Sequence, residues 1–369
     1  MTSRTPVSFI QLGRQFAAFE DEFVEIFRRI GRSGHYVMGP ELAGFEAEFA
    51  AYVQTRHALG VANATDGLAL ALKALGVGPG DEVITAANSF IASAGAIVEV
   101  GAVPVFADIR DDLNIDPASI ERKITARTRA LMPVHLTGRP ADMDAINAIA
   151  AKHGLRVVED AAQSVGATYK GRRTGGLGDI GVFSLHPLKN LHLYGDGGVI
   201  TTNDPELHQR IARLRNHGLI DRDTCAEWGR NSRLDELQAA IGRVKLRHIE
   251  AFNQRFREIA GFYRDRLGAV LTIPAERPYE HNVHHNFVVL TERREQLSAF
   301  LAERGIDTKV RYPRLLNQQP AFTAAGGGCD TPVAAALNTR ILSLPIYPEI
   351  TGAELQVVTD AILAFFTQT

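Results

Sequence analysis

The sequence predicts an α/β protein with a three-layer α/β/α large domain on a mostly parallel sheet, followed by a smaller α+β C-terminal domain. Strand-like runs alternate with helical patterns from about residue 60 to residue 205, which is typical of a parallel sheet covered on both faces. A long helical pattern and a second, shorter alternation follow. Because 369 residues exceed what one hydrophobic core usually organises, we expect two domains, 1–245 and 246–369, with an N-terminal segment able to pack against the smaller one.

Six short apolar runs have the length expected of buried strands, and helical patterns separate several of them. Ligands bind beyond the carboxyl ends of the strands in such sheets, so polar residues that follow a strand are candidate site residues. The strand candidates are 82–85, 103–106, 130–134, 156–158, 182–184 and 199–202, and the helix candidates are 67–75, 91–98 and 143–153.

The second half of the chain begins with a helical pattern from Leu234 to about Arg266, whose apolar residues recur near every 3.6 positions. We expect one long helix that connects the two domains. Residues 284–291, 294–304 and 309–312 then alternate as strand, helix and strand. The glycine-rich segment 324–330 is not a P-loop, because no Lys-Ser/Thr pair follows its glycines.

Composition and charge exclude several classes of protein. The formal net charge of −2 argues against broad electrostatic binding to nucleic acid or to an anionic membrane. Cys225 and Cys329 are far apart and outside any CxxC motif, which favours free thiols in a reducing compartment. The chain has neither a signal-peptide pattern nor an apolar run near the roughly 18 residues of a membrane span. We therefore expect a cytoplasmic protein.

Residues 156–167, RVVEDAAQSVGA, combine an apolar strand with an acid pair and a small-residue segment read as the start of a helix. Asp160 ends the strand, where a ligand crevice is expected. A carboxylate there could hold a proton on a pyridine nitrogen and make the ring a better electron sink. The alternative is a plain N-cap for the following helix.

Two further segments carry candidate chemistry. Lys189 lies in a Pro- and Gly-bounded loop between two strands; such a lysine is either a solvated surface residue or, when buried, a nucleophile for carbonyl groups. In GVANATDGLAL (60–70), Thr65 and Asp66 fall at a helix N-terminus, where backbone N–H groups and the helix dipole favour a phosphate. Simple capping by Asn63 or Thr65 is the alternative.

Together these segments resemble the sugar aminotransferases of the DegT/DnrJ/StrS group, which are pyridoxal-phosphate (PLP) enzymes of fold type I. The similarity covers almost the whole chain and is most specific in VVEDAAQSVGA, FSLHPLKNLHLYGDGGVITTND and NSRLDELQAAIG. It implies that Lys189 is the catalytic residue and holds PLP as a Schiff base, and that Asn231 reaches the phosphate of the partner subunit's cofactor in a homodimer. The cofactor-binding residues that it implies are Thr65, Asp66 (through its backbone N–H), Phe90, Asp160, Gln163, Ser184, Lys189 and Asn231.

The resemblance also implies a reaction. An amino donor, usually L-glutamate, leaves its amine on the cofactor as pyridoxamine phosphate, and a keto sugar then takes it up. The Gly-Asp-Gly-Gly loop (195–198) is more similar to members that act on a nucleotide-linked 3-keto hexose. A C4-specific enzyme, an aminotransferase for a non-nucleotide keto sugar or ketocyclitol, and a non-catalytic PLP-binding regulatory protein remain alternatives. A PLP-dependent dehydratase is disfavoured because those relatives carry histidine in place of Lys189.

The chain departs from its relatives at two positions near the expected substrate. His186 stands where many relatives have Tyr or Phe, and Arg311 stands where many have His. His186 could touch the sugar or fill the same space, and Arg311 could meet a phosphate or carboxylate or be a surface charge. Both are therefore candidate substrate-binding residues. The HNVHH cluster (281–285) lacks a carboxylate-containing zinc motif, so we expect no metal site and place His285 near a substrate or an interface.

Overall fold

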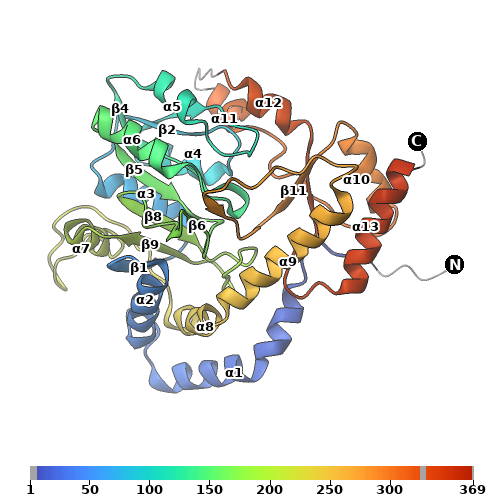
Figure 1. Cartoon of the computed structure of the whole chain (residues 1–369). Helices are drawn as coiled ribbons and strands as arrows, with labels where there is room; N and C mark the ends of the chain where they lie inside the picture. Colours follow the sequence, from blue (N-terminus) through green and yellow to red (C-terminus); the bar gives the residue numbers. More distant parts are fainter. Residues whose placement is uncertain (1–5, 325–329, 368–369) are drawn as a thin grey trace.

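The protein is built around a seven-stranded sheet, seen in a computed structural model that describes residues 6–324 and 330–367 (Figure 1). The strands follow the order β1-β9-β8-β5-β4-β2-β3. Each strand has five residues, an ordinary length for a globular protein. Their bounds are β1 His57–Val61, β2 Glu82–Ala86, β3 Val103–Ala107, β4 Thr128–Met132, β5 Arg156–Asp160, β8 Ile180–Ser184 and β9 Gly198–Thr202.

The direction of the strands brings the important loops to one edge of the sheet. Strands β3, β2, β4, β5 and β8 are joined by parallel pairings, whereas β9 is antiparallel to both β8 and β1. Strand β1 therefore runs in the same direction as β8. Because β9 starts at the edge where β8 ends, the loop between them (185–197) lies at the carboxyl edge, where ligands bind in folds of this kind.

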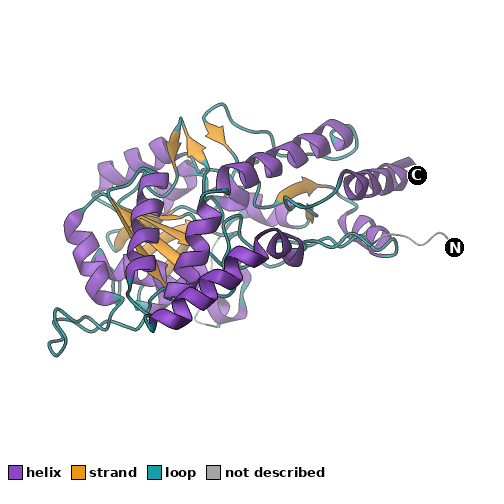
Figure 2. Cartoon of the chain, turned by 90° about the horizontal axis from the view of Figure 1, so that it is seen from below, coloured by secondary structure: helices purple, strands orange, loops and turns teal. Residues whose placement is uncertain are grey.

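Helices cover both faces of the sheet, which confirms the predicted three-layer α/β/α class (Figures 1 and 2). On one face lie α3 Ala64–Ala74, α4 Ile91–Glu99 and α7 Pro205–Leu214. On the other face lie α2 Pro40–Val53, α5 Pro117–Lys123, α6 Met143–His153 and α8 Glu236–Leu246, with α1 Leu12–Ser33 packed outside against α8.

The C-terminal part is the smaller α+β unit that the sequence predicts. Strand β11 Phe287–Leu290 pairs antiparallel with β12 Ile341–Leu344, and α9 Ile249–Leu267, α10 Arg294–Ala302 and α13 Gly352–Thr367 pack around them. Val7 is fully buried in the same apolar cluster, so the N-terminal segment contributes to this unit. The division at residues 245 and 246 stays a prediction.

Short elements complete the described chain. Strands β6, β7 and β10 form a separate three-stranded sheet. Their bounds, with those of the remaining helices, are β6 Thr168–Tyr169, β7 Arg172–Arg173, β10 Glu280–His281, α11 Pro320–Thr323, α12 Pro332–Asn338 and the 3-10 turns Leu136–Gly138 and Leu316–Gln318. Among the described helices none is long and apolar enough to cross a bilayer.

The structure corrects several boundaries. The predicted long helix is two helices, α8 and α9, because the chain turns at Arg247 and His248. Residues 309–312 form no strand: Lys309 bridges to Ser343, and the chain then turns away from β12. Strand β4 lies two residues earlier than predicted, and 284–291 shortens to β11. Most of the glycine-rich segment, residues 325–329 with Cys329, lies outside the described residues, whereas Cys225 is a free, exposed thiol.

Candidate active site

A cavity of about 690 Å³ lies at the carboxyl edge of the sheet, a volume ordinary for a small-molecule site. It is bounded by the N-terminal turn of α3, the loop that enters α4, the end of β5, the loop between β8 and β9, and residues 311–312. Nine of the ten predicted site residues line it, namely Thr65, Asp66, Phe90, Asp160, Gln163, Ser184, His186, Lys189 and Arg311.

Lys189 lies at the centre of the loop that joins β8 to β9. Its backbone N–H donates to the His186 carbonyl at 2.9 Å, which makes the loop a tight turn. Its amine forms no hydrogen bond or ion pair with any described residue. Burial lowers the pKa of Lys189 to about 8, against the attraction of the Asp160 carboxylate and with a further lowering by the positive charge of Arg311. The neutral, nucleophilic amine is therefore far more abundant at physiological pH than for a solvated lysine.

Asp160 ends β5 and is almost fully buried. Its Oδ2 accepts a hydrogen bond from the Ser93 hydroxyl at 2.7 Å, and its Oδ1 accepts one from the Ala162 backbone N–H at 3.2 Å. Burial raises the pKa of Asp160, and these two bonds and the charge of Lys189 oppose the rise. No described lysine or arginine forms an ion pair with it, so the carboxylate is free to receive the protonated nitrogen of a ligand ring.

The segment after Asp160 is not the helix that the sequence predicts. Residues 161–167 form two successive turns, in which the Ser164 N–H donates to the Ala161 carbonyl and the Ala167 N–H donates to the Ser164 carbonyl. Gly166 has a φ of +91°, a conformation that a helix excludes. Asp160 is therefore not a helix cap, and this alternative reading is wrong.

The neighbouring acid, Glu159, has separate partners. Its two oxygens accept three backbone N–H bonds of 2.6–2.8 Å from residues 175–178, and they also face the His135 ring at 2.9 Å. The other ring nitrogen of His135 accepts the Ala141 N–H at 3.0 Å, which assigns the ring proton to the side of Glu159. Side chains alternate along a strand, so β5 sends Glu159 to this buried network and Asp160 to the cavity.

The N-terminus of α3 offers a place for an anion. Thr65 lies in its first turn, Ser184 ends β8 nearby, and both line the cavity. A side chain on Gly198 would bring its Cβ to 2.7 Å from the Asn63 carbonyl carbon, so glycine lets the start of β9 approach this turn closely. Free N–H groups and the positive end of the helix dipole make such a turn favourable for phosphate.

The structure corrects the role expected of the Asp66 backbone N–H. That group donates to Asn63 Oδ1 at 2.8 Å, so it serves the N-cap of α3 and is not free for a phosphate. The Asp66 carboxylate instead pairs with Arg230 at 3.0 Å. Capping by Asn63 and exposure of Thr65 to the cavity therefore occur together.

Gln163 and two aromatic rings form one wall. The Thr137 N–H donates to Gln163 Oε1 at 2.8 Å, which fixes the amide, and the Gln163 Nε2 lies 3.5 Å from the Tyr312 hydroxyl. Phe90 is half exposed, with its ring centroid 5.4 Å from that of Tyr312. A flat ligand ring could lie against this wall.

Asn231 is the one predicted residue outside the cavity. It is exposed and bridges through its backbone to Asn216, at the base of a loop that follows α7 and extends away from the body (Figures 1 and 2). Trp228 on the same loop is 84% exposed. Within one chain, therefore, Asn231 does not join the other site residues.

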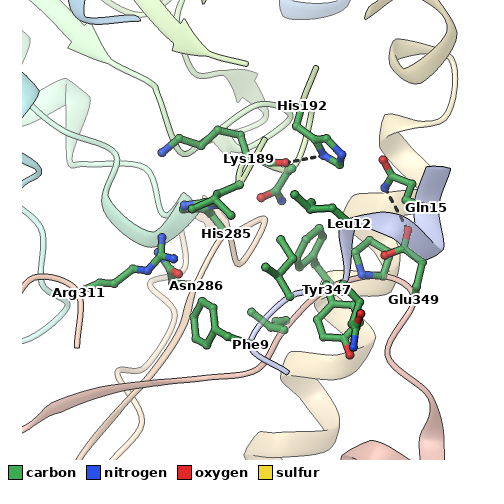
Figure 3. Close-up of a pocket in the computed structure, with 17 residues that line it drawn as sticks. Phe9, Leu12, Gln15, Lys189, His192, His285, Asn286, Arg311, Tyr347 and Glu349 are labelled. Atoms are coloured by element: carbon green, nitrogen blue, oxygen red, sulfur yellow. Dashed lines mark hydrogen bonds between the residues drawn. The ribbon is translucent and has the colours of Figure 1, made fainter. Parts of the chain in front are cut away.

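A second, small cavity lies on the other side of Lys189, and Figure 3 shows its lining. Lys189 and Arg311 line both cavities, and His285 faces this one. The neighbouring His284 pairs instead with Glu276 at 3.0 Å. Within the described ranges no group of three or more His, Cys, Asp or Glu is placed to hold a metal ion.

Sequence reasoning missed two residues of the site, Ser93 and Tyr312. Ser93 meets Asp160 only because α4 follows β2, and β2 and β5 are separated by a single strand, β4. Nothing local in the sequence signals that contact. Tyr312 stands beside the predicted Arg311. His285, which the sequence analysis expects near a substrate or an interface, lines the small cavity.

PLP enzymes of fold type I share this arrangement of sheet and helices. The family model for DegT/DnrJ/EryC1/StrS aminotransferases matches residues 17–363, and the chain belongs to that family. It is a sugar aminotransferase, and its cofactor is PLP; one similar solved structure, from Bacillus subtilis, contains bound pyridoxamine phosphate.

Three relatives illustrate the similarity. The chain is 44% identical to a dTDP-3-amino-3,4,6-trideoxy-alpha-D-glucose transaminase from Streptomyces venezuelae, over 98% of this chain and 97% of the relative. It is 41% identical to a UDP-N-acetyl-3-dehydro-alpha-D-glucosamine 3-aminotransferase from Acidithiobacillus ferrooxidans, over 98% of each. The crystal structure of S. venezuelae DesV with a ketimine intermediate superposes with a TM-score of 0.95 at 43% identity, over 98% of each chain.

Proposed function

We propose that this enzyme moves the amino group of L-glutamate to C3 of a nucleotide-linked 3-keto hexose, in amino-sugar biosynthesis. The observation that carries the proposal is the meeting of the Lys189 amine, the Asp160 carboxylate and the N-terminus of α3 in one cavity. The position on the sugar is supported by the two relatives named for 3-amino sugars and by the Gly-Asp-Gly-Gly loop.

The residues of the cavity fit PLP. Thr65 and Ser184 would hold its phosphate, Asp160 its ring nitrogen, and Gln163 its ring hydroxyl. Lys189, whose amine has no partner among the described residues, would bind its aldehyde carbon. When bound, PLP supplies an electron-withdrawing ring that acidifies the C–H bond next to the transferred amine.

Lys189 then serves as the proton carrier. Its Nζ removes the proton from the α-carbon of the amino donor in the first half-reaction and delivers a proton to C3 of the sugar in the second. A pKa near 8 suits both directions, because neither the neutral nor the charged amine is rare at neutral pH. Asp160 would keep the ring nitrogen of bound PLP protonated, and Ser93 holds the Asp160 carboxylate in place.

We also propose a homodimer in which Asn231 of each copy completes the other copy's site. The support is that Asn231 lies outside its own cavity, on a loop whose Trp228 is exposed. Co-expressing the Lys189→Ala and Asn231→Ala variants tests this idea, because one site of each mixed dimer would then hold both native residues. Random pairing should restore about a quarter of native activity. Mixtures no more active than the two variants alone would contradict sharing.

The substrate is tested by incubating the purified enzyme, PLP and L-glutamate with nucleotide-linked 3-keto and 4-keto hexoses and with a ketocyclitol. We expect amine to appear on the 3-keto sugar, detected by mass spectrometry and assigned by NMR. The Lys189→Ala variant is the control and should be inactive and lack the absorbance of lysine-bound cofactor. Amination of the 4-keto sugar or the cyclitol instead would refute the proposed substrate class.

A further inference from the structure

We propose that Arg311 and His285 bind a carboxylate of the amino donor beside Lys189. This inference rests on the proposed function and deepens it, because it assigns a recognition site for the first substrate. Both residues belong to the C-terminal part of the chain, and both lie next to Lys189. In Figure 3 the Arg311 guanidinium, the His285 ring and the Lys189 amine lie on the same side of the small cavity.

Arg311 is a half-buried cation without an anion. It forms no hydrogen bond and no ion pair with any described residue. Its guanidinium lies 5.0 Å from the centroid of the Phe9 ring, a contact that covers one face of the group and leaves its N–H edge available. By contrast, the buried Arg215 donates to both Glu46 and the Gly60 carbonyl.

His285 is a buried donor or acceptor without a partner. The residue is only 6% exposed, and its Nε2 meets no hydrogen-bonding atom of the described chain. Burial lowers the pKa of His285 well below its usual value, and the charges of Lys189 and Arg311 lower it further. The ring is therefore neutral, so it offers one N–H without adding charge.

Positive groups gather on the Lys189 side of the small cavity. Glu349, the one carboxylate among the residues that line this cavity, lies on the opposite side in Figure 3 and accepts a hydrogen bond from Gln15 at 3.1 Å. Lys189, Arg311 and His186 face this region, and the pKa of His186 is lowered by burial and by the charges of the other two. Asp160 is already held by Ser93 and Ala162, and the exposed Asp196 faces His186. A ligand anion is therefore the missing partner of Arg311.

The position next to Lys189 favours a carboxylate over the diphosphate of a nucleotide sugar. Lys189 acts on the α-carbon of the amino donor, and the α-carboxylate is attached to that same carbon. In a 3-keto sugar, C2, C1 and an oxygen separate the reacting carbon from the phosphorus. A guanidinium matches the two oxygens of a carboxylate with two parallel N–H bonds, and the His285 N–H can reach one of them.

The test follows the donor half-reaction of the holoenzyme by the change in cofactor absorbance, with L-glutamate and L-alanine as separate donors. In Arg311→Gln the apparent affinity for the donor should fall about tenfold to a hundredfold, the usual value of charge-assisted bonds to a carboxylate. His285→Phe should lower it roughly threefold to tenfold, because a neutral hydrogen bond contributes less. Arg314→Gln is the matched control: Arg314 is exposed in the same segment and lines neither cavity.

A second readout is calorimetric titration of glutarate, a dicarboxylate without an amine, into the holoenzyme variants. Glutarate affinity should fall in Arg311→Gln and not in Arg314→Gln. An equal loss for both donors would place the α-carboxylate at Arg311, and a loss confined to glutamate would place its distal carboxylate there; both outcomes support the proposal.

Other results would overturn it. Unchanged donor affinity in Arg311→Gln refutes the inference while the proposed function stands. Weaker binding of dTDP or UDP with unchanged donor kinetics would assign Arg311 to the nucleotide instead. If no amino acid donor converts the cofactor of the native enzyme, both proposals are overturned. Native-like melting temperature and cofactor absorbance in each variant establish that it is folded.

Discussion

In the apoenzyme, Lys189 should capture PLP with a pH dependence centred near pH 8. A solvated lysine has a pKa of 10.5, and burial lowers that of Lys189 to about 8. At pH 7 roughly a tenth of its amine is then neutral, about 300-fold more than for the solvated group. Because only the neutral amine attacks the aldehyde, the capture rate should rise about tenfold per pH unit below pH 8 and level off above it.

Two substitutions should move this midpoint in opposite directions. Asp160→Asn removes a negative charge that favours the charged amine, so the midpoint should fall. Arg311→Gln removes a positive charge that disfavours it, so the midpoint should rise. The assay mixes apoenzyme with PLP in stopped flow and records the absorbance of the lysine-bound cofactor between pH 6 and pH 10, at constant ionic strength.

The control is a solvent-exposed lysine peptide, whose rate should still be rising at pH 10. A rate for the enzyme that also rises without levelling would show that the Lys189 amine is solvated, and the reasoning from burial would fail. Shifts of the same sign in the two variants would show that their charges do not act on Lys189 as the structure indicates.

Three further predictions concern supporting contacts. Ser93→Ala removes the hydroxyl that donates to Asp160 Oδ2, which should raise the pKa of Asp160 and weaken PLP roughly threefold to tenfold, measured by fluorescence titration; unchanged affinity would contradict the positioning role. Asn63→Ala removes the N-cap of α3 and should lower the free energy of unfolding of the apoenzyme by about 1 kcal/mol in urea, whereas a neutral result would mean that water replaces the cap. Glu236→Ala leaves three N–H groups at the start of α2 without the carboxylate that accepts their hydrogen bonds. The substitution should lower the free energy of unfolding by about 2–4 kcal/mol and lower the melting temperature, and a decrease below about 1 kcal/mol would refute this account.

Much of the large sheet could be predicted because its strands are short, apolar and bounded by turn residues. The helices α1 and α2 are absent from the sequence prediction, although Phe19, Phe23, Ile26 and Ile30 recur at helical spacing. The reversed direction of β9 left no local signal, because direction depends on which neighbours a strand finds. The turn between α8 and α9 contains neither glycine nor proline, so the continuous hydrophobic periodicity led to the prediction of one helix instead of two.

In the candidate site, too, some residues could be assigned from the sequence, whereas contacts between distant segments could not. Lys189, Asp160, Ser184 and Thr65 could be assigned because each follows or begins an element at the carboxyl edge, within a segment that resembles the family. The pairing of Ser93 with Asp160 and the unpaired state of Arg311 depend on contacts between distant segments. The Asp66 backbone N–H was misassigned because a cap and a phosphate site compete for the same donors, and the sequence does not say which one takes each group.

The adjacent acids of β5 limit how this enzyme can be redesigned. Glu159 and Asp160 differ by one methylene and one position, yet the first is held by three backbone N–H groups and a histidine, and the second serves the ligand. Deleting one residue within β5 would present Glu159 to the cavity and leave the N–H groups of residues 175–178 facing the wrong side chain. An engineer who wants a new sugar should therefore vary the segments around His186 and Arg311 and keep the length of this strand fixed, since its register decides which acid meets the cofactor.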